Sequence, residues 1–390
     1  MELYRKIIIL IICLIFFYIL YRLVLQRLDI YTNRSPVESF QTQSVNNLQS
    51  ANKTDLNIHT INLSAINPVN GITNKKRALE LQQYCIKAAY HPAFDGNDMS
   101  IDMLGYTIGR GCRFLVFEIY WASPTQLYTS IATTNPNFVN SACPVVAMSD
   151  DATVPASNCI ALQDVLSFIN DTAFTNACPN NGDPMFIQFC VKYDVNVVSS
   201  STIYDAIASI VENMHNLYHG DVDSTTSLVD LMGKIVIVMD TRDKNTYFTA
   251  DSPNLEAVVN MSVPSNSMQG YTYTDLNGAY NNRMKILSGN SGYITNATEI
   301  NEVLPQTSTQ LNEGSNTPTL HLMTSNYNAL GMVSNQGVQI TPMLFWSNEN
   351  YLSQYENMFN YGKAGIIPMS MALRFAMHNS SSNVKSIAYP

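Results

Sequence analysis

The sequence predicts an α/β fold, a (β/α)8-type barrel preceded by one N-terminal transmembrane helix. Three observations lead to this prediction: an unbroken apolar run near the N-terminus, apolar strands that alternate with amphipathic helices after residue 77, and strands that are apolar at almost every position. Strands of this last kind are typical of a parallel sheet covered by helices. The chain has 390 residues, 46% of them hydrophobic, which is enough for a sizeable core.

The first element is the apolar run of residues 7–25, which begins with Ile7 and ends with Leu25. As a helix, this run spans about 28 Å at roughly 1.5 Å per residue, close to the hydrocarbon thickness of a bilayer. No small-x-small cleavage site follows it, so we expect an uncleaved anchor rather than a signal peptide. Basic residues flank the run on both sides, which leaves the orientation in the membrane open.

The composition predicts four segments along the chain. Residues 1–27 form the membrane anchor and residues 28–76 a polar linker or stem, because "SPVESFQTQSVNNLQSANKTDLN" is rich in Asn, Ser, Thr and Gln and shows no sustained periodicity. Residues 77–378 form the barrel, and residues 379–390 a C-terminal tail.

Within the barrel segment, strands and helices are predicted from apolar periodicity. Helical stripes occur at Leu162, Val165, Leu166 and Ile169, and again between Ile203 and Met214, with the i, i+3, i+4 spacing that buries one face. With about 300 residues available, an eightfold barrel is the economical arrangement. The strands are expected in "YCIKAAY", "CRFLVFEIYW", "PMFIQFCVKY", "GKIVIVMD", "GVQITPMLFW" and "AGIIPMS".

The charge balance argues against a nucleic-acid partner. The chain has 21 basic and 30 acidic residues, a formal net charge of −9, and no basic stripe. Proteins that bind nucleic acid through its phosphates need clustered positive charge.

The order of several segments resembles the catalytic domain of phosphoinositide-specific phospholipase C, a PLC-like phosphodiesterase barrel. The likeness covers roughly residues 79–375 and is closest to degenerate versions encoded by large DNA viruses. It rests on the order of "YCIKAAYHPAF", "GRGCRFLVFEIYW", "LQDVLSFINDTAF", "DPMFIQFCVKYD" and "LMGKIVIVMD", followed by "GVQITPMLFWSNENYLSQYENMFNYGKAGIIPMS".

The resemblance implies that the acid/base residues of the family are absent here. The family uses two histidines, the first four residues after an isoleucine and directly before an asparagine that binds Ca²⁺. Aligned at Ile86, the first histidine position holds Tyr90, and His91 falls on the asparagine position. A shift of one residue would turn the imidazole away from the site unless the loop is remodelled, which Pro92 makes harder. The region of the second histidine, "PTQLYTSIATT", offers only hydroxyls.

The resemblance also implies that the Ca²⁺ ligands are mostly lost. The two carboxylate positions on the second strand hold Val116 and Glu118, and a further carboxylate position holds Cys190. Because Ca²⁺ takes six to eight oxygen ligands, one surviving carboxylate cannot hold it. We therefore expect neither a metal nor another cofactor, and regard Tyr90, His91 and Glu118 as remnants of a catalytic site.

Four other residues are candidates for binding at the mouth of the barrel, namely Lys87, Arg113, Trp121 and His321. Glu118 is expected to pair with Arg113 or Lys87 there, which is commoner for a lone barrel carboxylate than catalysis. The alternative is an active phosphodiesterase with a site rebuilt around His91, Glu118 and His321, the one case in which Ca²⁺ would be needed.

The sequence thus predicts a single-pass membrane protein whose barrel is a catalytically inactive structural or binding module. The viral likeness implies a virion role, at an internal membrane or at the interface between capsid and membrane. The expected partners are the lipid bilayer, through the N-terminal helix, and capsid or other virion proteins.

The cysteines, one pair of histidines and the glycosylation sequons give three further expectations. We expect at most one disulfide, drawn from Cys143, Cys159 and Cys178, and no bridge at the strand residues Cys85, Cys112 and Cys190. His215 and His219 have i, i+4 spacing near a predicted helix end, where a helix-dipole role is favoured over a metal site. Sequons of the Asn-x-Ser/Thr type begin at Asn33, Asn52, Asn62, Asn170, Asn260, Asn296 and Asn379, and an Asn-rich chain also produces such sequons by chance.

Overall fold

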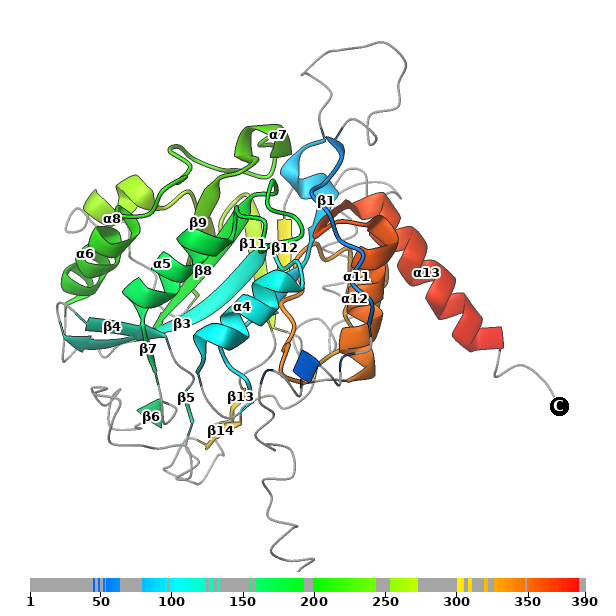
Figure 1. Cartoon of the computed structure of the whole chain (residues 1–390), viewed down its shortest axis with the longest axis horizontal. Coiled ribbons are helices and arrows are strands. Elements are labelled where there is room, and N and C mark those ends of the chain that lie inside the picture. Colours follow the sequence, from blue (N-terminus) through cyan, green and yellow to red (C-terminus); the bar gives the residue numbers. More distant parts are fainter. Residues whose placement is uncertain are drawn as a thin grey trace, which may run out of the picture. The chain divides into compact units, whose positions relative to one another are not determined.

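A parallel sheet runs through the centre of the domain (Figure 1). Its strands pair in the order β2 (Ala88–Tyr90), β3 (Phe114–Ser123), β8 (Met185–Lys192), β9 (Ile235–Asp240) and β10 (Met261–Val263). Their side chains are almost entirely buried, with Phe, Leu, Ile and Val on both faces. Each such side chain contributes roughly 1.5–3 kcal/mol when it leaves water, so these strands form the core.

The structure is a computed structural model of the chain. It describes residues 45, 48–49, 52, 54–63, 79–96, 99–123, 126–129, 132–133, 154–155, 159–192, 199–242, 253–272, 300–304, 308–310, 319–321, 326–347 and 349–385. All of these belong to one unit, Gln43–Pro390.

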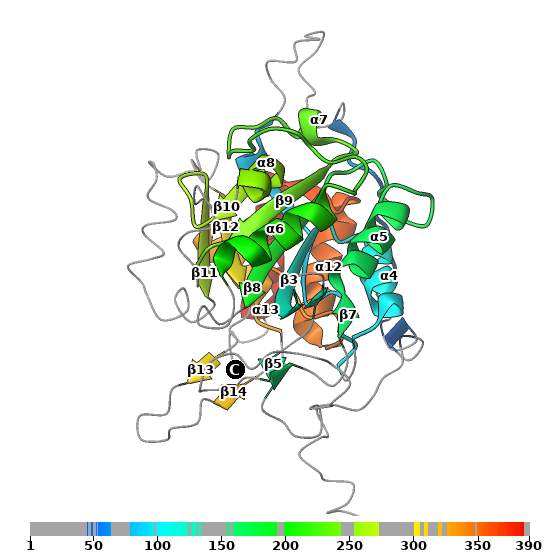
Figure 2. The ribbon, with the colours of Figure 1, turned by 90° about the vertical axis from the view of Figure 1, so that its left-hand side faces the viewer.

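Helices connect the parallel strands and cover the sheet. They are α4 (Ile101–Gly109), α5 (Leu162–Thr172), α6 (Ser200–Val211), α7 (Leu228–Leu231) and α8 (Pro253–Val258). Figure 2 shows α5, α6 and α8 over the β3, β8 and β9 part of the sheet. The first turns of α4 and α6 are capped by serine side chains that accept a backbone N–H three residues on. The predicted helical stripes therefore exist, although α6 ends at Val211, before the last predicted position and before both histidines of the His pair.

A second group of strands continues the sheet beyond β2. Backbone N–H groups of Ile86 and Tyr90 donate to the carbonyls of Gln339 and Met343, so residues 339–343 run parallel to β2. The same segment is bridged through Ile340 to β12 (Ile300–Leu304), which pairs in parallel with β11 (Met268–Thr272). Within the described residues no ladder joins β10 to β11. The α/β fold is confirmed, whereas closure into an eight-stranded barrel stays a prediction.

Several strands at the edges are antiparallel, unlike the predicted all-parallel arrangement. β4 (Gln126–Thr129) pairs with β3, and β7 (Ile160–Ala161) pairs with β4. β15 (Ile366–Pro368), one of the predicted strands, runs antiparallel to β1 (Tyr84–Ile86). Two short antiparallel pairs stand apart from this sheet, β5 (Ala132–Thr133) with β6 (Val154–Pro155) and β13 (Ser308–Gln310) with β14 (Thr319–His321).

The C-terminal helices pack together near β1 and β15 (Figure 1). They are α11 (Ala329–Gln336), α12 (Asn350–Gly362) and α13 (Met369–Lys385), and the short η2 (Leu81–Gln83) precedes β1. Because α13 continues to Lys385, residues 379–385 of the predicted tail are helical.

The segment predicted as a linker contributes to the folded domain. Leu48, Ile58 and Ile61 are buried in the main hydrophobic core. The backbone N–H of His59 donates to the carbonyl of Lys363 at 2.9 Å. The prediction of a loose stem from residue 28 to residue 76 is therefore wrong for the described residues between 48 and 61. A few apolar side chains are enough to hold an extended segment against the core, and they need not follow a helical or strand periodicity.

A buried carboxylate, Glu356 on α12, fastens this N-terminal segment to the sheet. It accepts from Lys87 Nζ at 3.0 Å, from Arg110 Nε and Nη2 at 2.7 Å each, and from Asn52 Nδ2 at 2.8 Å. Burial alone would raise the pKa of Glu356, but the Lys87 charge and the Arg110 contacts outweigh burial and lower it. We call Asn52, Lys87, Arg110 and Glu356 the Glu356 cluster.

The predicted membrane anchor, residues 7–25, lies outside the described residues. Among the residues that the structure does describe, no helix combines the length and apolar character that crossing a bilayer requires.

We expect Glu356→Gln to lower the free energy of unfolding by roughly 3–5 kcal/mol at neutral pH, because Lys87 and Arg110 would be left buried without a carboxylate. Urea denaturation followed by circular dichroism measures this change. The exposed Glu212 provides the matched control, since Glu212→Gln removes a carboxylate that lies in water. In the unsubstituted chain a lowered pKa means that this stability is present above the unfolded value, 4.5, and is lost in more acidic solution. A loss no larger than that of the control would contradict the assignment.

Candidate functional site

A row of polar side chains lies at the carboxyl ends of the parallel strands. The strand registers pair Glu118 of β3 with Cys190 of β8, and Cys190 with Asp240 of β9. Tyr90 ends the neighbouring β2. In parallel α/β sheets the carboxyl ends of the strands are the usual place for ligands and chemistry. This row is therefore the candidate functional site.

Both carboxylate oxygens of Glu118 accept hydrogen bonds from tyrosines. Tyr90 donates to Oε1 at 3.1 Å and Tyr120 to Oε2 at 2.7 Å. Burial first, and the negative charge of Glu118 second, raise the pKa of Tyr90 well above its ordinary value of 10. Glu118 is thus bonded to neutral hydroxyls, and the expected pairing with Arg113 or Lys87 is wrong.

His91 lies beside Glu118 because its backbone turns sharply after β2. Its φ angle is 47°, in the left-handed region that few residues other than glycine adopt. This turn brings His91 Nε2 to 4.0 Å from Glu118 Oε2 and the imidazole ring to 4.1 Å from the Tyr90 ring. The imidazole therefore does not point away from the site, as a plain strand shifted by one residue would require. Only 2% of His91 is exposed.

A second polar group lies beside Glu118 at the ends of β8 and β9. We call it the Arg242 cluster, and its members are Gln188, Cys190, Asp240, Arg242 and Glu302. The Arg242 Nε group donates to Asp240 Oδ1 at 3.0 Å, and Nη2 contacts Asp240 Oδ2 as well as Glu302 Oε2, the latter at 3.4 Å. Gln188 Nε2 donates to Asp240 at 3.3 Å and to Glu302 at 3.4 Å. Cys190 Sγ donates to Asp240 Oδ2 at 3.2 Å. The cluster therefore connects β8, the end of β9 and β12.

Glycine on β11 makes room for Arg242. Gly270 pairs with Glu302 across the β11–β12 ladder, and a Cβ at Gly270 would lie 2.9 Å from Arg242 Nη1. The same Cβ would lie 2.5 Å from Val263 Cγ1, so a side chain at this position would require Val263 and the end of Arg242 to move. The absence of a side chain at Gly270 therefore leaves room for both of them.

Burial and charge act in opposite directions on the two charged partners. Burial raises the pKa of Glu302 to about 7, although Arg242 lowers it. Burial would lower the pKa of Arg242, but the charges of Glu302 and Asp240 outweigh burial and raise it. Arg242 therefore stays charged, and Glu302 exchanges its proton near neutral pH.

Holding a Ca²⁺ ion here would require several of these contacts to break. The acidic groups that meet among the described strand ends are Glu118, Asp240 and Glu302, and each already accepts from tyrosine, arginine, glutamine or cysteine. Ca²⁺ prefers six to eight oxygens with their lone pairs available. The two positions at which the sequence resemblance places further ligands hold the buried Val116 and the thiol of Cys190.

The other predicted binding residues lie elsewhere. Lys87 and Arg113 come directly before β2 and β3, at the opposite ends of these strands from Glu118. Lys87 belongs to the Glu356 cluster, and Arg113 donates to the carbonyls of Ala173 and Asn180. Both are fully buried, so they are part of the structural core rather than of a mouth.

Trp121 and His321 are not brought together with this site by any described contact. Trp121 is buried on β3, where it pairs with Leu127 of β4. His321 ends β14, which pairs with β13 in a separate two-stranded sheet, and its side chain lies outside the described residues. His215 and His219 lie in irregular chain after α6.

The cysteines agree with the prediction for the strands. Cys85, Cys112 and Cys190 are buried thiols that form no disulfide, as expected. Cys159 is disulfide-bonded. Cys178 is free, accepts from Arg113 and donates to Asn180, so the partner of Cys159 lies outside the described residues.

Sequence analysis missed the Arg242 cluster. Asp240 and Arg242 stand directly after the predicted strand "GKIVIVMD", so the rule that chemistry follows strand ends would have found them. Glu302 and Gln188 gave no such signal. Glu302 lies on β12, which is too polar to be predicted as a core strand, and Gln188 lies inside an otherwise apolar strand.

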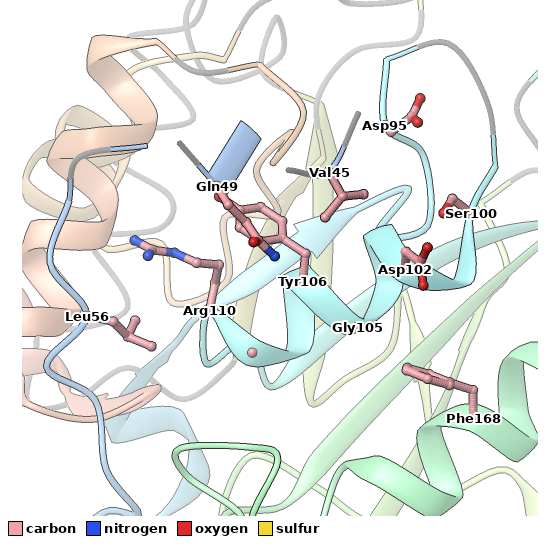
Figure 3. Close-up of a pocket in the computed structure, with 11 residues that line it drawn as sticks. Val45, Gln49, Leu56, Asp95, Ser100, Asp102, Gly105, Tyr106, Arg110 and Phe168 are labelled. Atoms are coloured by element: carbon pink, nitrogen blue, oxygen red, sulfur yellow. The ribbon is translucent and has the colours of Figure 1, made fainter. Parts of the chain in front are cut away.

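A groove of ≈ 850 Å³ runs along the outer side of α4, apart from the strand ends (Figure 3). Asp95, Ser100 and Asp102 lie at one end of it, and Arg110 and Leu56 at the other. Its remaining lining residues are Val45, Gln49, Gly105, Tyr106, Gly109 and Phe168.

No protein-family model matches the chain, and no curated protein matches it in sequence. Among solved structures, PLC21 of L. pealei is similar with a TM-score of 0.49 and 14% identity, over 76% of this chain and 38% of that one. A calcium-dependent phosphoinositol-specific phospholipase C from Pseudomonas sp. gives 0.41 and 10%, over 75% of this chain and 96% of that one. A phosphodiesterase from Oleispira antarctica gives 0.36 and 10%, over 69% and 96%. At this identity and these TM-scores, activity, substrate and partners stay proposals for this chain.

We expect Glu302→Gln to reduce the pH dependence of stability near neutral pH. The pKa of Glu302 is raised from 4.5 to about 7 in the folded chain. Its preference for the neutral carboxyl therefore contributes fully to stability below pH 4.5, and this contribution is lost as the pH rises through about 7. The amide is neutral at every pH, so the variant should be at least as stable as the unsubstituted chain at about pH 8. Denaturant midpoints measured between about pH 5 and pH 8 test this expectation.

Part of the slope should remain in this variant. Burial also raises the pKa of Asp183, to about 6, so Asp183 contributes in the same direction at lower pH. Glu212→Gln, at an exposed position, serves as the control and should leave the slope unchanged. Identical slopes for Glu302→Gln and the unsubstituted chain would show that Glu302 does not titrate near neutral pH.

Proposed function

We propose that this chain is a degenerate relative of the phospholipase C barrel that works as a binding or structural module, without catalysing phosphodiester cleavage. The observation that carries this proposal is the Arg242 cluster. In it the chain's own arginine contacts two of the three acidic groups at the site, Asp240 and Glu302, and offsets one negative charge. A charge that is already satisfied internally has little to offer a metal or a phosphate.

The residue at the position of the catalytic base supports the same proposal. Tyr90 stands where the family has its first histidine, and its raised pKa keeps the hydroxyl protonated at neutral pH. General base catalysis needs a group whose pKa lies near the working pH and whose lone pair can accept a proton. Tyr90 instead donates its proton to Glu118 in a hydrogen bond.

The alternative function is a phosphodiesterase with a rebuilt site. One observation favours it, the 4.0 Å approach of His91 Nε2 to Glu118, because an imidazole next to a carboxylate is a common acid/base pair. Against it stands the burial of both groups, since 2% of His91 and 4% of Glu118 are exposed. A substrate would have to displace Tyr90, Tyr120 or the loop after β2 to reach them.

The membrane anchor at residues 7–25 is a further part of the proposal. Since Leu48 is already part of the core, the connecting chain is shorter than the linker predicted from composition. Residues 26–47 can reach at most roughly 75 Å when fully extended. An anchor of this reach raises the effective concentration of the domain near the bilayer without strong lipid contacts. Capsid or other virion proteins as partners remain predictions of the sequence resemblance.

We expect the full chain, reconstituted in phosphoinositide-containing vesicles, to release no phosphorylated head group in the presence of Ca²⁺. Loss of the acid and base groups alone removes on the order of 10⁴-fold or more of the rate. Head-group release is measured by chromatography, with an active phospholipase C on the same vesicles as the assay control.

Glu118→Gln is the matched variant, because it keeps the shape of the side chain and removes its charge. The proposal requires that the two proteins behave alike in this assay. Turnover that depends on Ca²⁺ in the unsubstituted chain and disappears in Glu118→Gln would instead establish the rebuilt phosphodiesterase.

A further inference from the structure

The sequons of the chain differ in whether their amide nitrogens are chemically accessible. N-glycosylation joins a sugar to the side-chain nitrogen, Nδ2, of asparagine in an Asn-x-Ser/Thr sequon. A folded chain can carry this bulky group only where Nδ2 faces solvent. Five of the seven sequons begin at described residues, namely Asn52, Asn62, Asn170, Asn260 and Asn379.

Two sequons are incompatible with a glycan in this fold. Asn260 is 5% exposed, and its Nδ2 donates to the carbonyls of both Tyr218 and Gly220 at 2.9 Å. Its Oδ1 accepts from Ile237 at 2.7 Å. Asn52 Nδ2 donates to Glu356 at 2.8 Å and so belongs to the Glu356 cluster. A sugar on either nitrogen would break at least one of these partly buried hydrogen bonds and would destabilise the fold.

Asn170, in the last turn of α5, differs from both. Its Oδ1 accepts from the backbone N–H of His215 at 2.7 Å, which fixes the orientation of the side chain. Its Nδ2 has only a long contact of 3.5 Å with Asp171, on an exposed part of the helix. The hydroxyl that completes the sequon belongs to Thr172, which lies in the same helical turn. The amide oxygen is therefore held by His215, while the amide nitrogen makes no short hydrogen bond among the described residues.

Two other sequons are less well defined. Asn379 Nδ2 donates to the carbonyl of Phe375 at 3.0 Å within α13. Asn62 is exposed, but Ser64 of its sequon lies outside the described residues.

An independent observation concerns the compartment in which the domain folds. Cys159 is disulfide-bonded, and structural disulfides persist in oxidising compartments and are rare in the cytosol. N-glycans occur on secreted and extracytoplasmic domains, so the disulfide and an accessible sequon agree on the location.

We propose that Asn170 carries an N-linked glycan and, on the basis of the membrane anchor proposed above, that this domain faces the oxidising, extracytoplasmic side of that membrane. In the reaction, Asn170 Nδ2 forms a bond to C1 of an oligosaccharide whose bond to a lipid pyrophosphate breaks. The lipid pyrophosphate leaves, and the amide loses one proton to the transferring enzyme. The hydrogen bond from His215 to Asn170 Oδ1 persists, because only the nitrogen is modified.

The glycan would also restrict where a partner can dock. Asn170 lines a hollow of ≈ 210 Å³ between α5 and the chain after α6, together with Asp171, Asn213 and His215. A sugar at this position covers that end of the two helices. The groove along α4 is lined by Phe168 but not by Asn170, so the glycosylated residue does not form part of that groove.

The test uses the full chain, produced in animal cells, with three variants at one sequon. Asn170→Gln removes the acceptor, Thr172→Ala removes the hydroxyl but keeps the amide, and Thr172→Ser keeps both functions. Treatment with an N-glycosidase, followed by electrophoresis and peptide mapping, reports occupancy at each asparagine.

We expect the unsubstituted chain and Thr172→Ser to carry a glycan at Asn170. Asn170→Gln and Thr172→Ala should migrate as chains with one glycan fewer, and Asn52 and Asn260 should be unmodified in all soluble protein. An unmodified Asn170 in chain whose Cys159 is disulfide-bonded would overturn the proposal. So would a glycan on Asn260 in protein that stays folded, because the accessibility argument would then fail.

Discussion

The side chain of Arg242 links parts of the domain that the described backbone ladders leave separate. Among the described residues, the parallel strands from β2 to β10 form one hydrogen-bonded run, and β11 with β12 forms another. Residues 339–343 bridge β1 and β2 of the domain to β12. Arg242, at the end of β9, connects β9 to β12 through Asp240 and Glu302. Gly270, which has no Cβ, leaves room for its guanidinium beside β11. The α/β arrangement is therefore held at its carboxyl ends by one cation between two carboxylates.

The two ends of the sheet are stabilised by charge in opposite ways. At the amino ends, one carboxylate, Glu356, serves two cations, Lys87 and Arg110. At the carboxyl ends, one cation serves two carboxylates, and a third carboxylate, Glu118, is bonded to tyrosines. Buried charges persist only where partners compensate their lost hydration. Compensation of this kind makes a stable interior and leaves little free charge for catalysis, which is why we favour a binding module over an enzyme.

The sequence predicts the local elements of this fold better than their assembly. Continuous apolar runs predict β3, β8 and β9, because these strands are buried on both faces. Apolar stripes predict α5 and α6, because each helix buries one face. The antiparallel pairing of β15 and the packing of residues 48–61 depend on distant partners and left no periodic signal. For the site, the sequence singles out Tyr90, His91 and Glu118 as remnants of a catalytic site, and the structure places the three side chains next to one another. The position of the imidazole could not be predicted, since it depends on the left-handed backbone at His91.

A double-mutant cycle between Arg242 and Glu302 tests the central claim most directly. The free energies of unfolding of the unsubstituted chain, Arg242→Met, Glu302→Gln and the double variant give the coupling between the two side chains. We predict a favourable coupling of roughly 1 kcal/mol or more at about pH 8, where Glu302 is ionised, and a smaller one at about pH 5.5, where it is neutral. A coupling below about 0.5 kcal/mol at the higher pH would mean that Arg242 neither links β9 to β12 nor neutralises the strand ends.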